Sequence, residues 1–395
     1  METNRENPAV VLPDYANGSI VNLMSSILRA FDGPDLGYSS FRGLPPEEIR
    51  QYRQVVLIVL DGLGDDLLAR IGAMSNLRRY RRSRLTSVFP TTTATAITSF
   101  LTGEAPRQHG MTGWHMYLRE LGAVLAILPG RPRYGGMPLK QAGLDVKQLL
   151  GHRPLFDHLQ AKCLMVAPRF IARSDYNQAH LGKAGLVDFG EINEFFGSIA
   201  RALAENHHRR FIYAYWSELD HVAHESGSLS AEAANHLTVW DTAFGRFLDE
   251  VAGTDTLVLV TADHGFVDID EHKVIELAEH PDLETCLSLP LCGEPRAAYA
   301  YVKPRRVRDF ESYVSGYLNE FMELHRSEDL IAGGWFGAGA THPRLADRIG
   351  DYTLVMKDSF VIHDRLMGEK PFHLRGVHGG ISRSEMWVPL SVIGA

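Results

Sequence analysis

The stretch Val55-Val56-Leu57-Ile58-Val59-Leu60 is an uninterrupted apolar run, rich in β-branched residues, that leads directly into Asp61-Gly62. A short run without polar alternation is typical of a parallel strand that is buried on both faces. Two later stretches repeat the pattern, at residues 211–216 and 257–261. The three runs are therefore predicted to be strands of one parallel sheet.

Helical stretches separate these strands, at residues 20–31, 192–205 and 231–251. In the last of them, apolar side chains recur at helical spacing. Strands that alternate with helices predict an α/β fold, a doubly wound and mostly parallel sheet with helices on both faces. Ligands of such sheets bind at the carboxyl ends of the strands.

With 395 residues, the chain exceeds what one small core usually fills. The pattern changes between residues 267 and 374, which we interpret as an inserted α+β cap subdomain. Residues 1–266 and 375–395 then form the catalytic core. The elements expected in the insert are a strand, an amphipathic helix, a glycine-rich turn and a second strand, at residues 297–302, 307–324, 333–339 and 352–357.

The composition is that of an ordinary globular protein, with 45% hydrophobic and 22% charged residues. Acidic residues outnumber basic ones by 48 to 40, which argues against binding of a nucleic-acid polymer. The basic run at residues 78–84 is interpreted as a solvated helix face, with attraction of an anionic substrate as the alternative.

Cellular location is predicted from cysteines and from hydropathy. Cys163, Cys286 and Cys292 are too few and too scattered for a disulfide framework, which indicates a reducing compartment. The N-terminal residues lack a basic segment followed by an apolar one, and no window approaches the ~18 apolar residues of a membrane span. A cytoplasmic protein without membrane association is therefore expected, and the oligomeric state stays open.

A carboxylate follows each of the three apolar runs, namely Asp61, Asp220 and Asp263. A single aspartate there could simply cap the next helix. Three anions at one sheet edge would repel one another and lose hydration, whereas divalent cations would neutralise them. The pattern therefore predicts a metal site.

Histidines accompany these carboxylates. Asp220 and His224 are four residues apart, so on a helix both side chains project from the same face. His264 directly follows Asp263, and His378 lies in a glycine-rich segment. Carboxylate and imidazole ligands without thiolates suit zinc, with manganese or another transition ion as alternatives.

The segment from Phe89 to Gly103 is rich in threonine and alanine and is predicted to contain a helix that ends at Gly103. Its threonines would lie about the helix N-terminus, where free amides and the helix dipole favour a phosphate group. A hydroxyl bound to a metal there could act as a nucleophile. Alternatively, one threonine caps the helix and the others only pack as small residues.

Taken together, these motifs resemble the alkaline phosphatase superfamily, closest to its nucleotide pyrophosphatase/phosphodiesterase branch. The resemblance extends over residues 55–380 and rests on Val-Leu-Asp-Gly at 59–62, Phe-Pro-Thr-Thr-Thr at 89–93, Asp-His-Val-Ala-His at 220–224, Ala-Asp-His-Gly at 262–265 and Gly-Val-His-Gly at 376–379. It implies two divalent ions, one held by Asp61, Thr93, Asp263 and His264, the other by Asp220, His224 and His378.

The resemblance also implies a reaction. Thr93 matches the family's nucleophile, so the expected protein is a metal-dependent hydrolase that cleaves phosphodiester or pyrophosphate bonds of a small molecule or nucleotide through a phosphothreonine. The chain departs from the family's pattern in two respects. Residues 104–130 contain no asparagine to hold a phosphoryl oxygen, and Ala94-Thr95-Ala96 follows the nucleophile segment where nucleotide-cleaving members often have Phe-Pro-Asn-His. The candidate substrate-binding residues are Thr112, Trp114, His115 and Tyr176.

Other functions fit less of the sequence. A phosphomonoesterase would need a serine nucleophile and a nearby arginine, and a sulfatase would need a Cys/Ser-x-Pro-x-Arg motif. A phosphomutase shares the metal ligands, and the insert could serve one. A dinucleotide-binding oxidoreductase would need a third glycine where Leu67 stands, and a non-catalytic metal-binding protein would not need Thr93.

Overall fold

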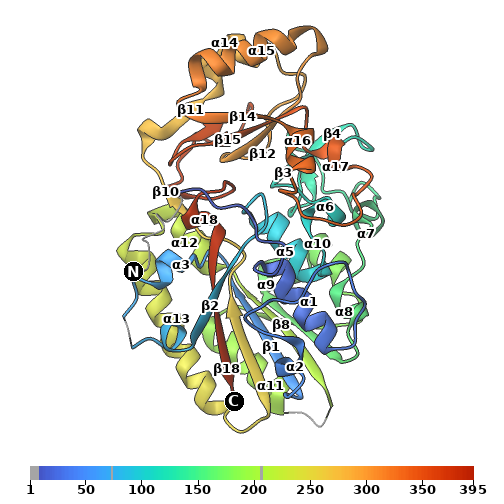
Figure 1. Cartoon of the computed structure of the whole chain (residues 1–395), viewed down its shortest axis with the longest axis vertical. Coiled ribbons are helices and arrows are strands. Elements are labelled where there is room, and N and C mark those ends of the chain that lie inside the picture. Colours follow the sequence, from blue (N-terminus) through green and yellow to red (C-terminus); the bar gives the residue numbers. More distant parts are fainter. Residues whose placement is uncertain (1–8, 73, 205–207) are drawn as a thin grey trace, which may run out of the picture.

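The computed structural model describes residues 9–72, 74–204 and 208–395, and its larger lobe is built around a seven-stranded sheet (Figure 1). β18 alone runs opposite to the other six strands of this sheet, which confirms the predicted mostly parallel α/β fold. In spatial order the strands are β2 (Arg81–Thr86), β18 (Trp387–Gly394), β9 (Thr256–Thr261), β1 (Gln54–Leu60), β8 (Arg210–Trp216), β6 (Lys162–Pro168) and β7 (Gly185–Phe189).

The three strands predicted from their apolar runs are adjacent. β1 lies between β8 and β9, and every residue of β1 is buried, as expected of a strand covered on both faces. Leu60 pairs with Trp216, and Val59 pairs with Thr261. Because these registers align the carboxyl ends of the strands, the residues that follow them meet at one edge of the sheet.

Helices cover both faces of this sheet. On one face α13 (Ala231–Glu250) packs against α11 (Ile192–Ala204) and α12 (Glu218–Ser226), and on the other α5 (Thr93–Thr102) packs against α1 (Ile20–Ala30) and α8 (Leu155–His158). Figure 1 shows the two groups on opposite sides of the strands. The predicted helices coincide with α1, α11 and α13, and Glu205 lies outside the described residues.

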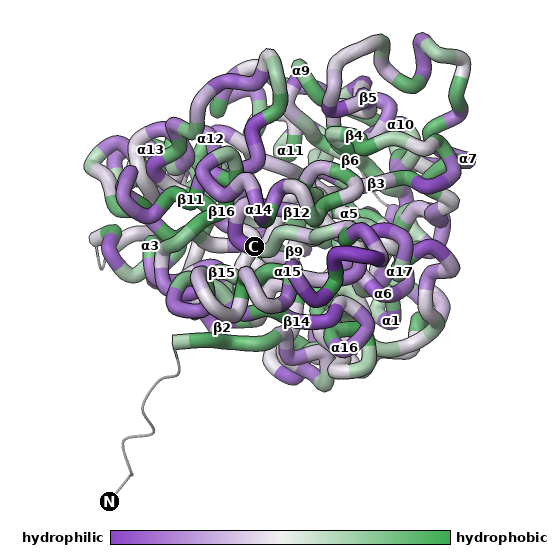
Figure 2. The backbone as a smooth tube through the Cα atoms, turned by 90° about the horizontal axis from the view of Figure 1, so that it is seen from above, coloured by the Kyte–Doolittle hydropathy of each residue, from purple (hydrophilic) through white to green (hydrophobic). Residues whose placement is uncertain are grey.

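Amphipathic patterning explains how α13 packs. Leu237, Trp240, Phe244 and Phe247 are all buried, as their helical spacing predicted. In Figure 2 the tube of α13 alternates between hydrophobic and hydrophilic residues. The helix thus buries one stripe against the core and leaves the other in solvent.

The smaller lobe, at the top of Figure 1, contains a second seven-stranded sheet that is antiparallel throughout. Its order is β14 (Met322–Arg326), β15 (Tyr352–Met356), β13 (Ala297–Ala300), β12 (Cys292–Glu294), β3 (His115–Leu118), β4 (Ala123–Ala126) and β5 (Arg131–Pro132). The last three strands lie in the part of the chain assigned to the core from sequence. The pairing of Gly293 with His115 joins them to the insert, and a local pattern cannot show a pairing between such distant segments.

The predicted helix at residues 307–324 is too long. α15 spans Val307–Tyr313 and continues as a π-helical turn at Val314–Leu318, after which Met322–Arg326 forms strand β14. Met322 pairs with Met356 across the sheet. Pairing with β15 therefore overrides the helical periodicity of the last residues.

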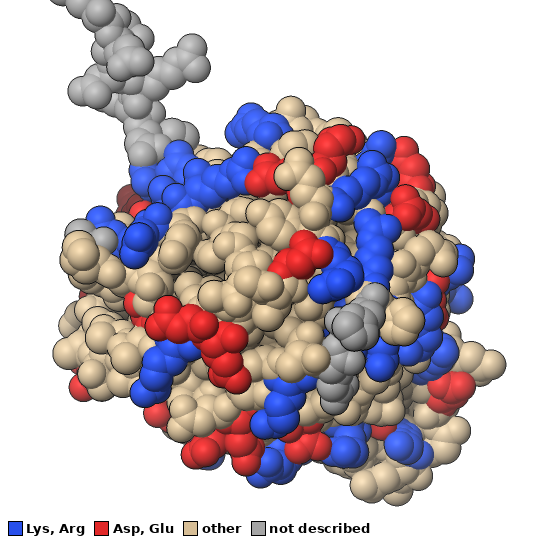
Figure 3. All heavy atoms as spheres, turned by 90° about the horizontal axis from the view of Figure 1, so that it is seen from below, with Lys and Arg blue, Asp and Glu red and all other residues tan. Residues whose placement is uncertain are grey.

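The basic run at residues 78–84 is not one helix face, because it divides between α4 (Asn76–Arg79) and the edge strand β2. Arg81 forms two 2.7 Å hydrogen bonds with Asp65, and Arg82 pairs with Glu48. These two arginines therefore form local ion pairs at the edge of the sheet. Basic and acidic side chains are also interspersed over the molecular face in Figure 3.

Two further sequence expectations concern cysteines and membranes. Cys163, Cys286 and Cys292 are free and buried. Across the part of the chain that the structure describes, no helix has the length and apolar character needed to cross a bilayer.

Candidate active site

Two buried aspartates follow the central strands, and each has one oxygen that is held and one that is not. Asp61 Oδ2 accepts a hydrogen bond from the Tyr215 hydroxyl, and Asp263 Oδ1 accepts from the amides of Gly62 and His264 at 3.1 and 3.0 Å. Asp61 Oδ1 and Asp263 Oδ2 are buried without a hydrogen-bond partner in the described protein. Buried polar atoms of this kind indicate a missing ligand.

Three histidines meet these carboxylates, each with a defined tautomer. Nδ1 of His224, His264 and His378 donates to a backbone carbonyl, of Gly376, Gly265 and Thr91 respectively, at 2.8 to 3.1 Å. A carbonyl only accepts, so Nδ1 carries the proton and Nε2 presents its lone pair. Such an arrangement orients imidazoles for metal binding.

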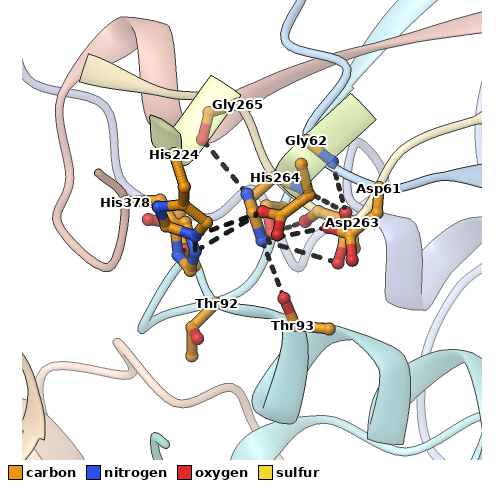
Figure 4. A network of polar contacts seen from close by, with 12 residues as sticks. Asp61, Gly62, Thr92, Thr93, His224, Asp263, His264, Gly265 and His378 are labelled. Atoms are coloured by element: carbon orange, nitrogen blue, oxygen red, sulfur yellow. Dashed lines mark hydrogen bonds and ion pairs between the residues drawn. The ribbon is translucent and has the colours of Figure 1, made fainter. Parts of the chain in front are cut away.

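The first group of ligand atoms surrounds His264 Nε2. It lies 3.4 Å from Asp61 Oδ1, 3.6 Å from Asp263 Oδ2 and 3.1 Å from Thr93 Oγ1. In Figure 4 His264 lies between the two aspartates and the two other histidines, with Thr93 at the start of a helix beneath it. The arrangement fits one cation bound by oxygen and imidazole.

The second group joins α12 to the loop after β17 (Gly376–Val377). His224 Nε2 lies 3.4 Å from Asp220 Oδ1, and His378 Nε2 lies 3.2 Å from His224 Nε2 and 3.8 Å from Asp220 Oδ1. Asp220 and His224 share one helix face, as their spacing predicted. The His264 and His378 rings stack with centroids 3.7 Å apart, so the two groups are adjacent.

The buried carboxylates and neutral imidazoles of this cluster favour the binding of cations. Burial, together with Asp220 and Asp263, raises the pKa of Asp61 well above its ordinary value. Burial, together with His264 and His224, lowers the pKa of His378 well below its ordinary value, which keeps that ring neutral. Divalent cations would offset the repulsion between the carboxylates and would use the histidine lone pairs. The residues present therefore fit bound metal ions.

The structure separates the three threonines at the start of α5. The Thr91 hydroxyl donates to the Gly380 carbonyl at 2.8 Å, and the Thr92 hydroxyl donates to Glu294 Oε1 at 2.6 Å. Only the Thr93 hydroxyl of these three contacts the carboxylate and histidine cluster. Although Thr92 occupies the N-cap position, its side chain does not cap α5, and the helix ends at Gly103 as predicted.

A cavity of about 460 Å³ opens over this cluster, with walls from both lobes. Trp114 and His115, two of the predicted substrate-binding residues, line it. Thr112 and Tyr176 do not: the Thr112 hydroxyl donates to the Arg348 carbonyl at 3.3 Å, and the Tyr176 hydroxyl pairs with Thr98 at 2.7 Å. Position along the chain indicated their neighbourhood but not the direction in which their side chains point.

Sequence reasoning missed Glu294, which lies in the wall of this cavity at the end of β12. Its Oε1 accepts from the Thr92 hydroxyl and from the Trp114 amide at 2.6 and 2.7 Å. Burial raises the pKa of Glu294 from 4.5 to about 7, while these two hydrogen bonds lower it and Asp220 raises it further. A single glutamate outside any motif gives no indication in the sequence that it lies in the wall of the cavity.

A buried ion pair supports the loop that carries His378. Arg296 donates to both oxygens of Glu385 at 3.0 and 2.9 Å, and Glu385 Oε1 also accepts from the Gly380 amide at 2.8 Å. Arg296 precedes β13 of the smaller lobe, so this pair ties the two lobes together beside the cluster. It was not predicted from sequence, because the two residues are far apart along the chain.

Comparison with known proteins shows the family of this chain. The sequence model of the type I phosphodiesterase / nucleotide pyrophosphatase family matches residues 55–381. The chain belongs to this family and is a phosphoric ester hydrolase. A comparison with curated protein sequences finds no match.

Solved structures show the same fold at low sequence identity. Human ectonucleotide pyrophosphatase / phosphodiesterase 5 has a TM-score of 0.66 and 15% identity, covering 86% of this chain and 87% of that chain. An inactive variant of the murine protein in complex with AMP has a TM-score of 0.65 and 15% identity, covering 85% and 87%. Phosphonoacetate hydrolase from Sinorhizobium meliloti 1021, in complex with phosphonoformate, has a TM-score of 0.59 and 17% identity, covering 87% and 90%.

Proposed function

We propose that this protein is a metal-dependent phosphodiesterase or nucleotide pyrophosphatase that acts on a small molecule. The observation that carries the proposal is the Thr93 hydroxyl, which lies 3.1 Å from His264 Nε2 at the edge of two adjacent groups of metal-ligand atoms. A site that combines such ligands with a hydroxyl facing a cavity is typical of catalysis rather than of a structural metal. The AMP complex of the murine relative supports nucleotides as the substrates to test first.

Two divalent ions are proposed, because the ligand atoms form two groups. Asp61, Thr93, Asp263 and His264 would hold one ion, and Asp220, His224 and His378 would hold the other. The set contains carboxylate, hydroxyl and imidazole but no thiolate, which suits zinc, with manganese or another transition ion as alternatives. When bound, the ions would stabilise the ionised Thr93 hydroxyl and the negative charge of the phosphoryl oxygens.

In the proposed reaction Thr93 Oγ attacks the phosphorus atom, and the bond from phosphorus to the leaving oxygen breaks. This step forms a phosphothreonine, which water then hydrolyses to restore the hydroxyl. The N-terminus of α5, where Thr93 lies, would favour the negative charge of the phosphoryl group. Two in-line displacements predict retention of configuration at phosphorus.

The smaller lobe is proposed to act as a cap that selects the leaving group. The division into a core of residues 1–266 and 375–395 and a cap of residues 267–374 is kept, except that the paired strands β3, β4 and β5 belong with the cap. Trp114 and His115, which line the cavity, then come from the cap. They are proposed as substrate contacts.

The test compares hydrolysis of bis-(p-nitrophenyl) phosphate with that of p-nitrophenyl phosphate, on zinc-loaded and chelator-stripped protein. Zinc-dependent preference for the diester supports the proposal. Preference for the monoester would replace it with a phosphomonoesterase. No turnover of either by metal-loaded protein would overturn it and favour a phosphomutase.

A further inference from the structure

Glu294 is held rigidly between the start of α5 and the smaller lobe. Its Oε1 accepts hydrogen bonds from Thr92, which directly precedes Thr93, and from the Trp114 amide. Glu294 is only 8% exposed, and it lines the same cavity as Thr93. Within the described residues Oε2 accepts no hydrogen bond, so this oxygen can face a substrate bound in the cavity.

The backbone next to His378 fixes Glu294 from the other side. Gly379 has a φ of +119°, and a Cβ at this position would lie 2.6 Å from Glu294 Cβ. A larger residue would therefore displace the glutamate, and glycine permits the close approach. Glu294 is thus held against the chain neighbours of Thr93 and of His378, in the wall of the cavity that Thr93 and His378 also line.

The charge of Glu294 bears on the charge of the substrate. A phosphate monoester carries a charge of about −1.5 to −2 at neutral pH, whereas a diester carries one negative charge because its third oxygen bears a carbon substituent. We propose that Glu294 is a specificity-determining residue, whose carboxylate excludes phosphate monoesters and so restricts the site to diesters. This inference rests on the proposed function and names how the site selects its substrate.

The basic side chains of the cavity do not offset this charge. Arg133 is 5% exposed, and its Nε donates to Glu369 at 2.9 Å while Nη1 donates to the Leu291 carbonyl at 2.8 Å. Arg133 is therefore committed to groups of the smaller lobe. The other lysine or arginine of the lining, Lys370, is exposed. Apart from the proposed metal ions, which a monoester and a diester would share, a second negative charge on the phosphoryl group would consequently face the Glu294 carboxylate without a buried lysine or arginine of the cavity to neutralise it.

The test is the Glu294→Gln variant of the metal-loaded protein, with kcat/KM measured for both p-nitrophenyl esters at about pH 8.5, where a carboxyl of this pKa is ionised. Glutamine keeps the shape and can still accept from Thr92 and Trp114. The ratio of monoester to diester kcat/KM is expected to rise about 10-fold or more, because a like-charge contact is removed. Glu294→Asp keeps the charge and should retain the preference for the diester.

Glu279→Gln is the matched control, because it removes one negative charge at an exposed position outside the cavity. It should leave the ratio unchanged. An unchanged ratio in E294Q overturns the inference, and so does an equal rise in E279Q. Should E294Q fail to fold, Glu294→Ala removes the same charge without placing an amide there, and the same ratio decides the question.

Inhibition by inorganic phosphate gives a second readout that separates this inference from the proposed function. Phosphate should inhibit E294Q about 10-fold more strongly than the wild type, because the repulsion of a dianion is lost. A wild type that does not hydrolyse the diester would refute the proposed function. A wild type that prefers the diester, with equal phosphate inhibition in E294Q, would refute only the role of Glu294.

Discussion

Two buried groups of charged side chains lie beside the loop that carries His378, and they differ in how their charges are met. In the Arg296–Glu385 pair both carboxylate oxygens accept from the guanidinium. Burial alone would raise the pKa of Glu385, but Arg296, Ser382 and Gly380 hold it below its ordinary value. In the cluster, by contrast, Asp61 and Asp263 each keep a buried oxygen that has no hydrogen-bond partner among the described residues.

The difference is consistent with a structural role for the ion pair and supports the proposed catalytic role of the cluster. The ion pair is complete within the protein, so it stabilises the junction of the lobes. The carboxylates of the cluster have no arginine or lysine partner among the described residues, and burial together with Asp220 and Asp263 raises the pKa of Asp61. A buried anion without a counter-charge is costly, which supports ligands that come from outside the chain. The following experiments test this contrast, from the largest expected effect to the smallest.

Replacing Thr93 by alanine should break the chemistry of the cluster but not its metal binding. Diester hydrolysis is expected to fall by about 10⁴-fold or more, because the nucleophile is lost. Metal content, measured by mass spectrometry of the dialysed protein, should change little because six of the seven proposed ligands remain. Thr238→Ala, on the exposed face of α13, is the control and should keep full activity. Substantial turnover by T93A would remove the nucleophile assignment.

Replacing Arg296 by methionine should break the buried ion pair with Glu385. Since Glu385 is then buried without its counter-charge, the free energy of unfolding in urea is expected to fall by about 4 kcal/mol. Arg326→Met provides the comparison, because Arg326 and Glu311 form an exposed pair that is expected to contribute about 0–1 kcal/mol. If both variants lost the same free energy of unfolding, the buried Arg296–Glu385 pair would contribute no more to stability than the exposed pair.

Removal of metal should destabilise the cluster and should leave the Arg296–Glu385 ion pair unaffected. Chelation is expected to abolish activity and to lower stability by about 3 kcal/mol relative to protein with zinc at ~100 times its dissociation constant. The thermal midpoint measured with and without chelator gives the result. Asp263→Asn, which removes one proposed ligand, should show a smaller response to zinc. A midpoint that chelator leaves unchanged in the wild type would argue against bound metal.

The free energy of unfolding is expected to depend on pH through the titration of Glu294. Its folded-state pKa of about 7 exceeds the ordinary 4.5, so the folded state holds its proton more tightly than the unfolded state does. The stability contributed by this group is full below about pH 4.5 and is lost as the pH rises through about 7, by about 3 kcal/mol.

Urea unfolding of metal-stripped wild type and Glu294→Gln at several pH values measures this effect. The difference between the two proteins should change over that pH range, since glutamine does not titrate. Glu279→Gln should follow the wild type. Parallel pH profiles for the wild type and E294Q would contradict the raised pKa.

The sequence alone determined the sheet and the place of its carboxylates. The apolar runs are strands because their residues fit a doubly covered sheet, and Asp61 and Asp263 reach its edge because they follow those strands directly. His224 joins Asp220 because four residues make about one helical turn. Each of these inferences uses neighbours in the chain, where periodicity and adjacency act.

Only the tertiary structure decided what distant segments contribute. It turned the Thr92 and Thr93 hydroxyls to different partners, brought Glu294 into the cavity wall, paired Arg296 with Glu385 and joined β3 to the insert. It also turned Thr112 and Tyr176 into the interior, away from the cavity. These outcomes depend on packing between segments far apart in the chain, and the pattern of any one segment carries no record of its partner.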